Sequence, residues 1–197
     1  MTTTTRVPPT EITGLFGAAV KVFSRKMLGH VPESMGVMWH HPKMLKDMMG
    51  LNRKAEKWGR LDENLGGLAH MAAAAEVGCS FCLDLNYFMA HTRALDEAKA
   101  REVPRWREST LFSPLERRVM EYAEAMSRTP VAVTDEMSAA LLAELGAPAL
   151  LDLAGRVALM NASARTNIAL GIHSEYFADA CGLPPLATAS TDLGLTA

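Results

Sequence analysis

The sequence predicts an all-α protein, and three observations support this fold class. Alanine, leucine and methionine dominate the composition, and these residues favour helices. Apolar residues recur at three-to-four spacing, whereas alternating β-branched runs and the Asn-Gly or Asp-Gly turns of hairpins are missing. Signals that start and stop helices also alternate along the chain. We therefore expect a helical bundle without a substantial sheet.

The first predicted helix ends at Gly29 and carries a stripe of apolar residues: Ile12, Phe16, Val20, Phe23 and Met27. This stripe either packs on the chain's own core or docks on another subunit. Together with the many methionines, it offers more apolar surface than one small bundle buries. We therefore expect a homo-oligomer, either a dimer, a trimer or a hexamer.

The next helices are separated by proline, glycine and capping signals. A short helix is expected over residues 33–40, and a helix restarts at Lys43 and closes at Gly59. Asp62 is a plausible N-cap for the following helix. The middle of that helix, residues 69–75, consists almost entirely of small residues, which allow other helices to approach closely.

Gly78 ends this helix, and further helices are expected to begin near Cys79, Asp96, Ser113, Thr134 and Pro148. Ser113 can cap its helix, and Glu116, three residues later, can complete a capping box. Pro148 opens the longest apolar segment of the chain, which continues to Ile172.

A chain of 197 residues is long enough to bury a sizeable core and is most simply one domain. We expect a flexible N-terminal arm over residues 1–10 and a single helical domain over 11–182. A C-terminal tail follows over 183–197, beginning at Leu183-Pro184-Pro185.

The composition excludes several classes of partner. A formal charge of −2 gives no electrostatic basis for binding nucleic acid. The N-terminal residues 1–9 lack an apolar signal region, and Asp152 and Arg156 interrupt the most apolar later stretch, so no membrane segment is expected. Only three cysteines are present, which argues against a disulfide framework and for a reducing compartment. We expect a cytoplasmic protein.

Two of the three cysteines, Cys79 and Cys82, form a Cys-x-x-Cys pair at a predicted helix start. The backbone N–H groups and the dipole of a helix N-terminus favour a thiolate, and the second thiol can resolve the first. Two packed core thiols, or half of a zinc site, are the alternatives. A structural zinc ion needs four ligands, and the chain has no second pair, since Cys181 lies far away. We therefore expect no metal and no cofactor.

Four motifs between His40 and Ile172 resemble the carboxymuconolactone decarboxylase-like family, on its alkylhydroperoxidase (AhpD-like) side. They are His41-Pro42-Lys43-Met44-Leu45, Gly78-Cys79-Ser80-Phe81-Cys82, Trp106-Arg107 with Leu111-Phe112-Ser113-Pro114-Leu115-Glu116-Arg117, and Asn161-Ala162-Ser163-Ala164-Arg165-Thr166-Asn167. The resemblance implies an all-α fold with the cysteine helix inside a small bundle, assembly into oligomers, and a dithiol that reduces hydroperoxides and is recycled by a reductant.

The proton relay that the resemblance implies is absent as written. Its glutamate, twelve residues before the first cysteine, corresponds to Gly67, and its histidine, four after the second, corresponds to Asn86. A further histidine, which can occur between the cysteines, corresponds to Phe81. Glu76, three residues before Cys79, is the best substitute base, although it can equally be a solvated or capping carboxylate.

Four more residues are second-rank candidates for the site. Asp84 lies two residues after Cys82, at an angle unsuited to the same helix face, and Asn86 occupies a relay position. His70 and His91 lie nine residues before Cys79 and nine after Cys82, which is two and a half helical turns.

These residues favour a thiol-dependent peroxidase or disulfide reductase with a small hydroperoxide as substrate and a thiol reductant as partner. The sequence does not identify either molecule, nor the cysteine that reacts first. Lactone decarboxylation, which needs no dithiol, is one alternative. The other is a non-catalytic oligomeric binding or stress module with a degenerate site.

Overall fold

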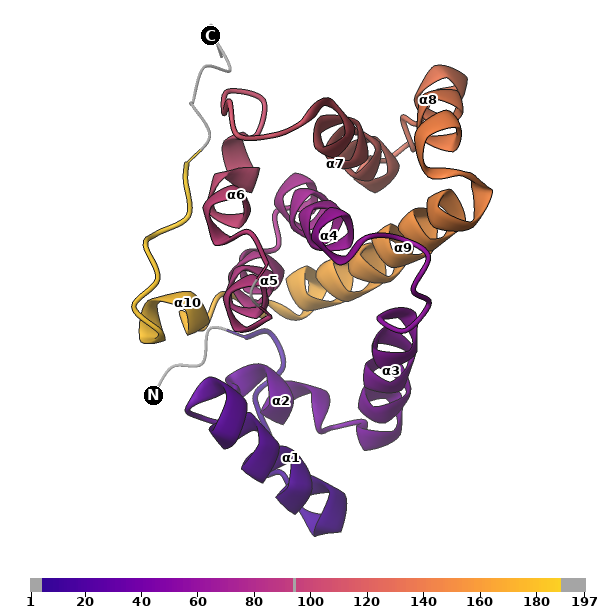
Figure 1. Ribbon diagram of the computed structural model, residues 1–197. Coiled ribbons are helices and arrows are strands. Elements are labelled where there is room, and N and C mark those ends of the chain that lie inside the picture. Colours follow the sequence, from indigo (N-terminus) through magenta and orange to yellow (C-terminus); the bar gives the residue numbers. More distant parts are fainter. Residues whose placement is uncertain (1–4, 94, 189–197) are drawn as a thin grey trace, which may run out of the picture.

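Within residues 5–93 and 95–188, which the computed structural model describes, the chain forms ten α-helices and one short 3₁₀ helix, without a strand (Figure 1). The predicted all-α fold class is thereby confirmed. The elements are α1 Gly14–Leu28, α2 Glu33–Met38, α3 Pro42–Ala55, α4 Glu63–Val77, α5 Ser80–Thr92, α6 Glu97–Glu102, η1 Val103–Arg105, α7 Pro114–Ser127, α8 Asp135–Leu145, α9 Ala147–Leu170 and α10 Phe177–Ala180. No helix in this described part is both long and apolar enough to cross a bilayer.

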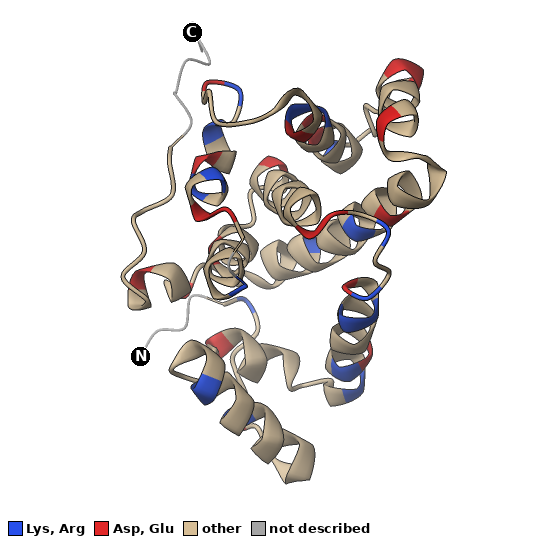
Figure 2. Ribbon diagram, in the orientation of Figure 1, with Lys and Arg blue, Asp and Glu red and all other residues tan. Residues whose placement is uncertain are grey.

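Helix α4 lies in the middle of the bundle, and α5, α7 and α9 pack around it (Figure 1). Four of its alanines, at positions 69, 72, 73 and 74, are completely buried. Its charged residues, Glu63 and Glu76, stand only near its two ends (Figure 2). The small side chains let three helices approach this central one, which is the close packing that the sequence predicts.

The predicted caps are present in the structure. The Asp62 carboxylate accepts two backbone N–H groups at the start of α4. Ser113 and Glu116 form a complete capping box at the start of α7. Gly29 and Gly78 end α1 and α4 in the left-handed conformation, with φ of 79° and 81°, which glycine adopts without steric cost.

Helix α3 ends earlier than the sequence predicts, at Ala55 and not at Gly59. Residues 56–59 turn away from the helix, and the Trp58 side chain packs against α9 at Gly155. A Cβ atom at position 155 would lie 2.6 Å from the Trp58 ring, so a larger residue there would have to displace the ring. A tertiary contact therefore decides where this helix ends, which local propensity could not show.

The stripe on α1 divides between two environments. Phe16 stacks on Trp39 with ring centroids 5.6 Å apart, beside the small core of Ile12, Val20 and Leu45. Phe23, by contrast, is 57% exposed, and its neighbours Leu15 and Val22 are 94% and 66% exposed. One part of the stripe therefore packs on the chain itself, and the other part is an uncovered apolar surface.

Both terminal segments contact the helical domain where the structure describes them. The Arg6 guanidinium donates to the carbonyls of Ile168 and Ala169 at the end of α9. Near the other end, Ala187 donates its N–H to the Arg101 carbonyl. The remaining residues of the predicted arm and tail, 1–4 and 189–197, lie outside the described residues.

Candidate functional site

The Cys-x-x-Cys motif sits at the start of α5, where the chain turns out of α4. Gly78 makes this turn in the left-handed conformation, and Cys79 is the N-cap of α5. The Cys82 backbone N–H donates to the Cys79 Sγ at 3.2 Å. The two Sγ atoms are bonded to each other, with their Cα atoms 5.3 Å apart. The sequence spacing thus brings both sulfur atoms together at the positive end of a helix.

This disulfide is enclosed by apolar side chains. Cys79 is 1% exposed and Cys82 is 4% exposed. Both belong to a cluster that includes Phe81, Phe88 and Phe177. Cys181, by contrast, is an exposed free thiol. A thiolate in this enclosed site has little water to stabilise it, so hydrogen-bond donors from the protein determine its energy.

Asn167 is a site residue that the sequence analysis did not select. Its Nδ2 donates to the Cys82 Sγ at 3.4 Å from the last turn of α9. Asn167 belongs to one of the family-like motifs, and Ala164, three residues earlier on the helix, is completely buried in the cysteine cluster. Helical spacing from the buried Ala164 was the signal that could have pointed to Asn167.

The Glu76 side chain forms an ion pair with Arg128, with 2.9 Å between Oε1 and Nε. This contact joins the end of α4 to the end of α7 and raises the pKa of the arginine through the hydrogen bond and the charge of Glu76. The carboxylate is 27% exposed. Its role as the base stays a prediction.

The two relay positions and His70 line one cavity of about 60 Å³ between α4 and α5. Gly67 and His70 come from α4, and Asn86 comes from α5. Asn86 donates its amide to the Cys82 carbonyl at 2.7 Å, so it lies one helical turn beyond the reactive pair. The structure thus brings His70 and Asn86, but not Glu76, to the same cavity.

His70 has a pKa lowered from 6.5 to about 4. Burial is the largest cause because it disfavours the charged imidazolium, and the Arg156 guanidinium adds repulsion. Glu56 opposes the shift and Arg93 supports it. At neutral pH this imidazole is therefore uncharged.

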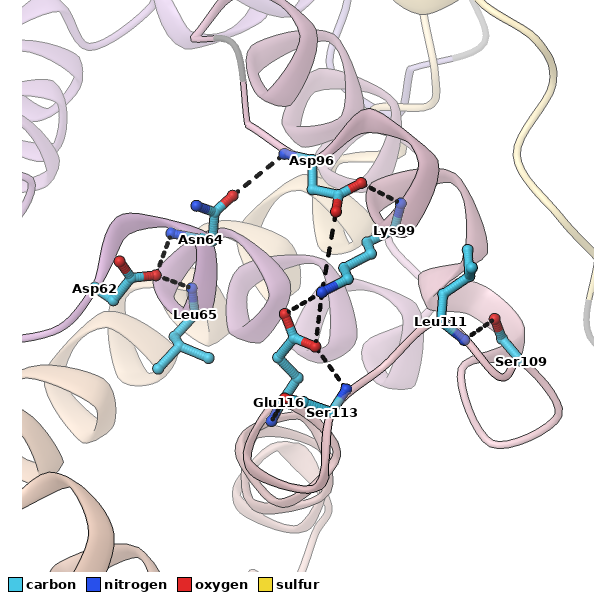
Figure 3. Close-up of polar contacts among 9 residues, drawn as sticks. All are labelled: Asp62, Asn64, Leu65, Asp96, Lys99, Ser109, Leu111, Ser113 and Glu116. Atoms are coloured by element: carbon cyan, nitrogen blue, oxygen red, sulfur yellow. Dashed lines mark hydrogen bonds and ion pairs between the residues drawn. The ribbon is translucent and has the colours of Figure 1, made fainter.

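One wall of the same cavity includes Lys99 and Glu116, which belong to a network of polar contacts (Figure 3). Lys99 contacts both carboxylate oxygens of Glu116 at 2.7 and 3.0 Å, and the Ser113 N–H donates to the same group at 2.7 Å. Burial opposes ionisation of Glu116, but these donors outweigh it and hold its pKa below the ordinary value. The charges of this wall are thus largely paired among themselves.

Asp84 binds the segment that follows α9. Its carboxylate accepts the Ser174 hydroxyl at 2.7 Å and the N–H groups of Phe177 and Ala178, each at 3.0 Å. Phe177 is thereby held against Phe81 in the cysteine cluster. We call residues 172–178 the cover segment, because it closes the apolar enclosure of the disulfide.

The last predicted candidate, His91, has its Nδ1 within hydrogen-bonding distance of the Glu97 carboxylate, at 2.7 Å, and both side chains are substantially exposed. In residues 5–93 and 95–188, no group of three or more histidine, cysteine, aspartate or glutamate side chains is placed to hold a metal ion.

Fold and site together define an all-α protein with a cysteine pair enclosed at a helix start. The family model described as carboxymuconolactone decarboxylase family matches residues 42–125, which include Cys79 and Cys82. The resemblance seen in the sequence motifs is thereby confirmed, and residues 42–125 are similar to this family.

A protein of related sequence also matches part of the chain. Over 115 residues the chain is 37% identical to YnjA of Escherichia coli strain K12, which is described as uncharacterized. That match covers 58% of this chain and 63% of YnjA, which is less than two thirds of the relative.

Solved structures share the fold. The debrominase Bmp8 in complex with 2,3,4-tribromopyrrole is similar with a TM-score of 0.77 and 19% identity, over 91% of this chain and 96% of that one. A peroxidase-related protein of Ralstonia eutropha JMP134, described as an alkylhydroperoxidase AhpD core, has a TM-score of 0.74 and 16% identity, over 90% and 97% of the two chains.

Proposed function

We propose that this protein is a thiol-dependent oxidoreductase that uses Cys79 and Cys82 to reduce hydroperoxides. The observation that carries this proposal is the direct bond between the two sulfur atoms at the N-terminus of α5. A pair that forms a disulfide within one chain can release two electrons and two protons to a substrate and be restored by an external thiol.

The reaction balances with these two cysteines. One thiol loses its proton to a base, and the thiolate attacks a peroxide oxygen. The O–O bond breaks, the alkoxide takes up a proton and leaves as an alcohol, and the cysteine becomes a sulfenic acid. The second thiol attacks this sulfur, the S–O bond breaks, water leaves and the disulfide forms. A thiol reductant then returns two electrons and two protons.

Glu76 is the proposed base. It lies at the end of α4, three residues before Cys79, and its carboxylate contacts Arg128 at 2.9 Å. The protein is also proposed to act as a homo-oligomer, which the exposed apolar surface of α1 supports. We propose the cytoplasm as its location.

A thiol titration tests the redox function. The reduced protein should lose two thiols per chain on addition of a hydroperoxide, and a dithiol should restore them. Cys181→Ser is the matched control, because Cys181 is exposed and unpaired, and this variant should behave like wild type. Cys79→Ser and Cys82→Ser should each abolish turnover. Thiols that stay unoxidised in the wild type would contradict the proposal.

A non-catalytic binding module is the second candidate, and two observations favour it. Both cysteines are almost completely buried, and the relay positions hold Gly67 and Asn86. The same titration separates the two functions, since a binding module is inert to hydroperoxide. Lactone decarboxylation is distinguished because it would persist in Cys79→Ser. Brominated pyrroles, which the debrominase Bmp8 binds, extend the panel of oxidising substrates.

A further inference from the structure

The two sulfur atoms of the site receive hydrogen bonds from different kinds of donor. The Cys79 Sγ accepts the Cys82 backbone N–H at 3.2 Å, which is part of the helix start itself. The Cys82 Sγ accepts the side-chain amide of Asn167 at 3.4 Å, which comes from α9. In the described part of the chain, no other side chain donates a hydrogen bond to the Cys82 sulfur. The state of Cys82 is therefore linked to a single replaceable group.

A hydrogen bond to sulfur matters most when the sulfur is charged. A disulfide sulfur is a weak acceptor, whereas a thiolate is an anion, and bonds to ions are roughly twice as strong as neutral ones. The Cys82 side chain is 4% exposed, so water cannot replace a lost donor. The Asn167 amide thus stabilises the reduced, ionised form of Cys82 much more than the oxidised form.

We propose that Asn167 is a catalytic residue of this site, which stabilises Cys82 as the thiolate that leaves when a reductant opens the disulfide. The inference rests on the proposed redox function of the pair. It assigns different roles to the cysteines, with Cys79 forming the mixed disulfide and Cys82 carrying the negative charge.

The electron balance of this step is as follows for a dithiol reductant. A thiolate of the reductant attacks the Cys79 Sγ, the Cys79–Cys82 bond breaks, and its electron pair remains on the Cys82 Sγ beside Asn167. The second thiolate of the reductant then attacks the reductant sulfur that is bonded to Cys79. A disulfide forms within the reductant, and Cys79 leaves as a thiolate. The protons lost by the reductant protonate the two cysteines. A leaving thiolate that is stabilised leaves faster.

The fold holds Asn167 in place for this task. Its own carbonyl accepts the Ile172 N–H at 2.9 Å, which closes the end of α9. Three residues earlier, Ala164 is completely buried against the cysteine cluster. Because these contacts involve the backbone and a different side chain, a change of the Asn167 amide should leave the helix intact.

The test compares Asn167→Asp and Asn167→Ala in a Cys79→Ser, Cys181→Ser background, where Cys82 is the only thiol. Alkylation of Cys82 by iodoacetamide is followed against pH. Loss of the donor should reduce the thiolate fraction of Cys82 by about tenfold at pH values below the midpoint of its ionisation. This is the size expected for a charge-assisted hydrogen bond. Asn167→Asp should have the larger effect, because a carboxylate also repels the thiolate.

Asn161→Ala is the matched control, since Asn161 is on the same helix and its amide donates to Ser127 Oγ and the Val157 carbonyl. This variant should leave the alkylation profile of Cys82 unchanged. Thermal unfolding by circular dichroism establishes that each variant is folded. Alkylation profiles that are unchanged in both Asn167 variants, or changed equally by Asn161→Ala, would overturn the inference.

The assigned roles are tested by trapping. Dithiothreitol added to the oxidised protein with an intact Cys79–Cys82 pair, followed by acid quench and mass mapping, should show the mixed disulfide on Cys79. An adduct mainly on Cys82 would overturn the assignment. These readouts need no hydroperoxide, so a wild type that is inert to hydroperoxide refutes the proposed peroxidase activity and leaves the effect of Asn167 on Cys82 measurable.

Discussion

Replacing His70 with asparagine should remove a loss of stability that wild type suffers as the pH falls from about 6.5 to about 4. In the folded chain the His70 pKa is lowered from 6.5 to about 4, mainly because of burial and then because of Arg156. As the pH falls below 6.5, His70 binds a proton in the unfolded chain but stays unprotonated in the folded chain. The free energy of unfolding therefore decreases through this window and levels off below pH 4.

The size of this effect follows from the two pKa values. A difference of about 2.5 between them corresponds to about 3 kcal/mol, at 1.36 kcal/mol for each pKa unit. Acidic groups with lowered pKa values, such as Asp152 and Glu116, also lose their stabilising effect in acid. Their ordinary values are 3.8 and 4.5, so their effects begin near the lower end of the window.

The assay is urea unfolding followed by circular dichroism at several pH values between about 7.5 and 4.5. The slope of the unfolding free energy against pH is compared, and not its absolute value, because the substitution also changes packing. His91→Asn is the matched control, since this histidine is exposed and lies outside the cavity; a change of slope as large as that of His70→Asn would show that burial is not the cause. Parallel curves for wild type and His70→Asn between pH 6.5 and 4.5 would refute the reasoning.

Three further predictions concern the cover segment, the base and assembly. Asp84→Asn should lower the unfolding free energy by about 1–3 kcal/mol, because the amide opposes the donors from Ser174, Phe177 and Ala178, and should speed reduction of the disulfide by dithiothreitol. The exposed Asp179→Asn is its control, and an unchanged reduction rate would mean that the cover segment does not limit access. Glu76→Gln should slow the stopped-flow reaction with hydroperoxide by at least about tenfold, since general-base help is typically worth about 10²- to 10⁴-fold. An equal or faster rate would remove Glu76 from the mechanism. Phe23→Glu should reduce the sedimenting mass at micromolar concentration, whereas Leu142→Glu, which is similarly exposed on α8, should not. A monomeric wild type would contradict the expected oligomer.

The parts of the fold that the sequence predicted well depend on neighbouring residues. Asp62 caps α4 through N–H groups two and three residues ahead, and the capping box of Ser113 and Glu116 spans one turn. Gly78 needs only its own lack of a side chain. Such features combine residue type and position within a few residues, so a single sequence contains all the information that they require.

The parts that the sequence did not show depend on residues far apart in the chain. Asn167 reaches Cys82 across 85 positions, and Asp84 binds a segment 90 or more positions later. Helical periodicity predicted that Asp84 lies away from the helix face of the cysteines. It did not predict which residues Asp84 contacts on its own face. Likewise, Glu76 stood near Cys79 in sequence, but Arg128 is the partner that its carboxylate contacts.

The contact of Arg6 with the end of α9 has a consequence for how the N-terminus is handled in experiments. Its guanidinium donates to the carbonyls of Ile168 and Ala169, and its backbone N–H donates to that of Leu170. These three residues directly follow Asn167, so shortening the chain past Arg6 would uncover the last carbonyls of the helix that presents the amide to Cys82. Thiol reactivity measured on a truncated chain would then report on a frayed helix end, and affinity tags with a protease site close to Arg6 carry the same risk.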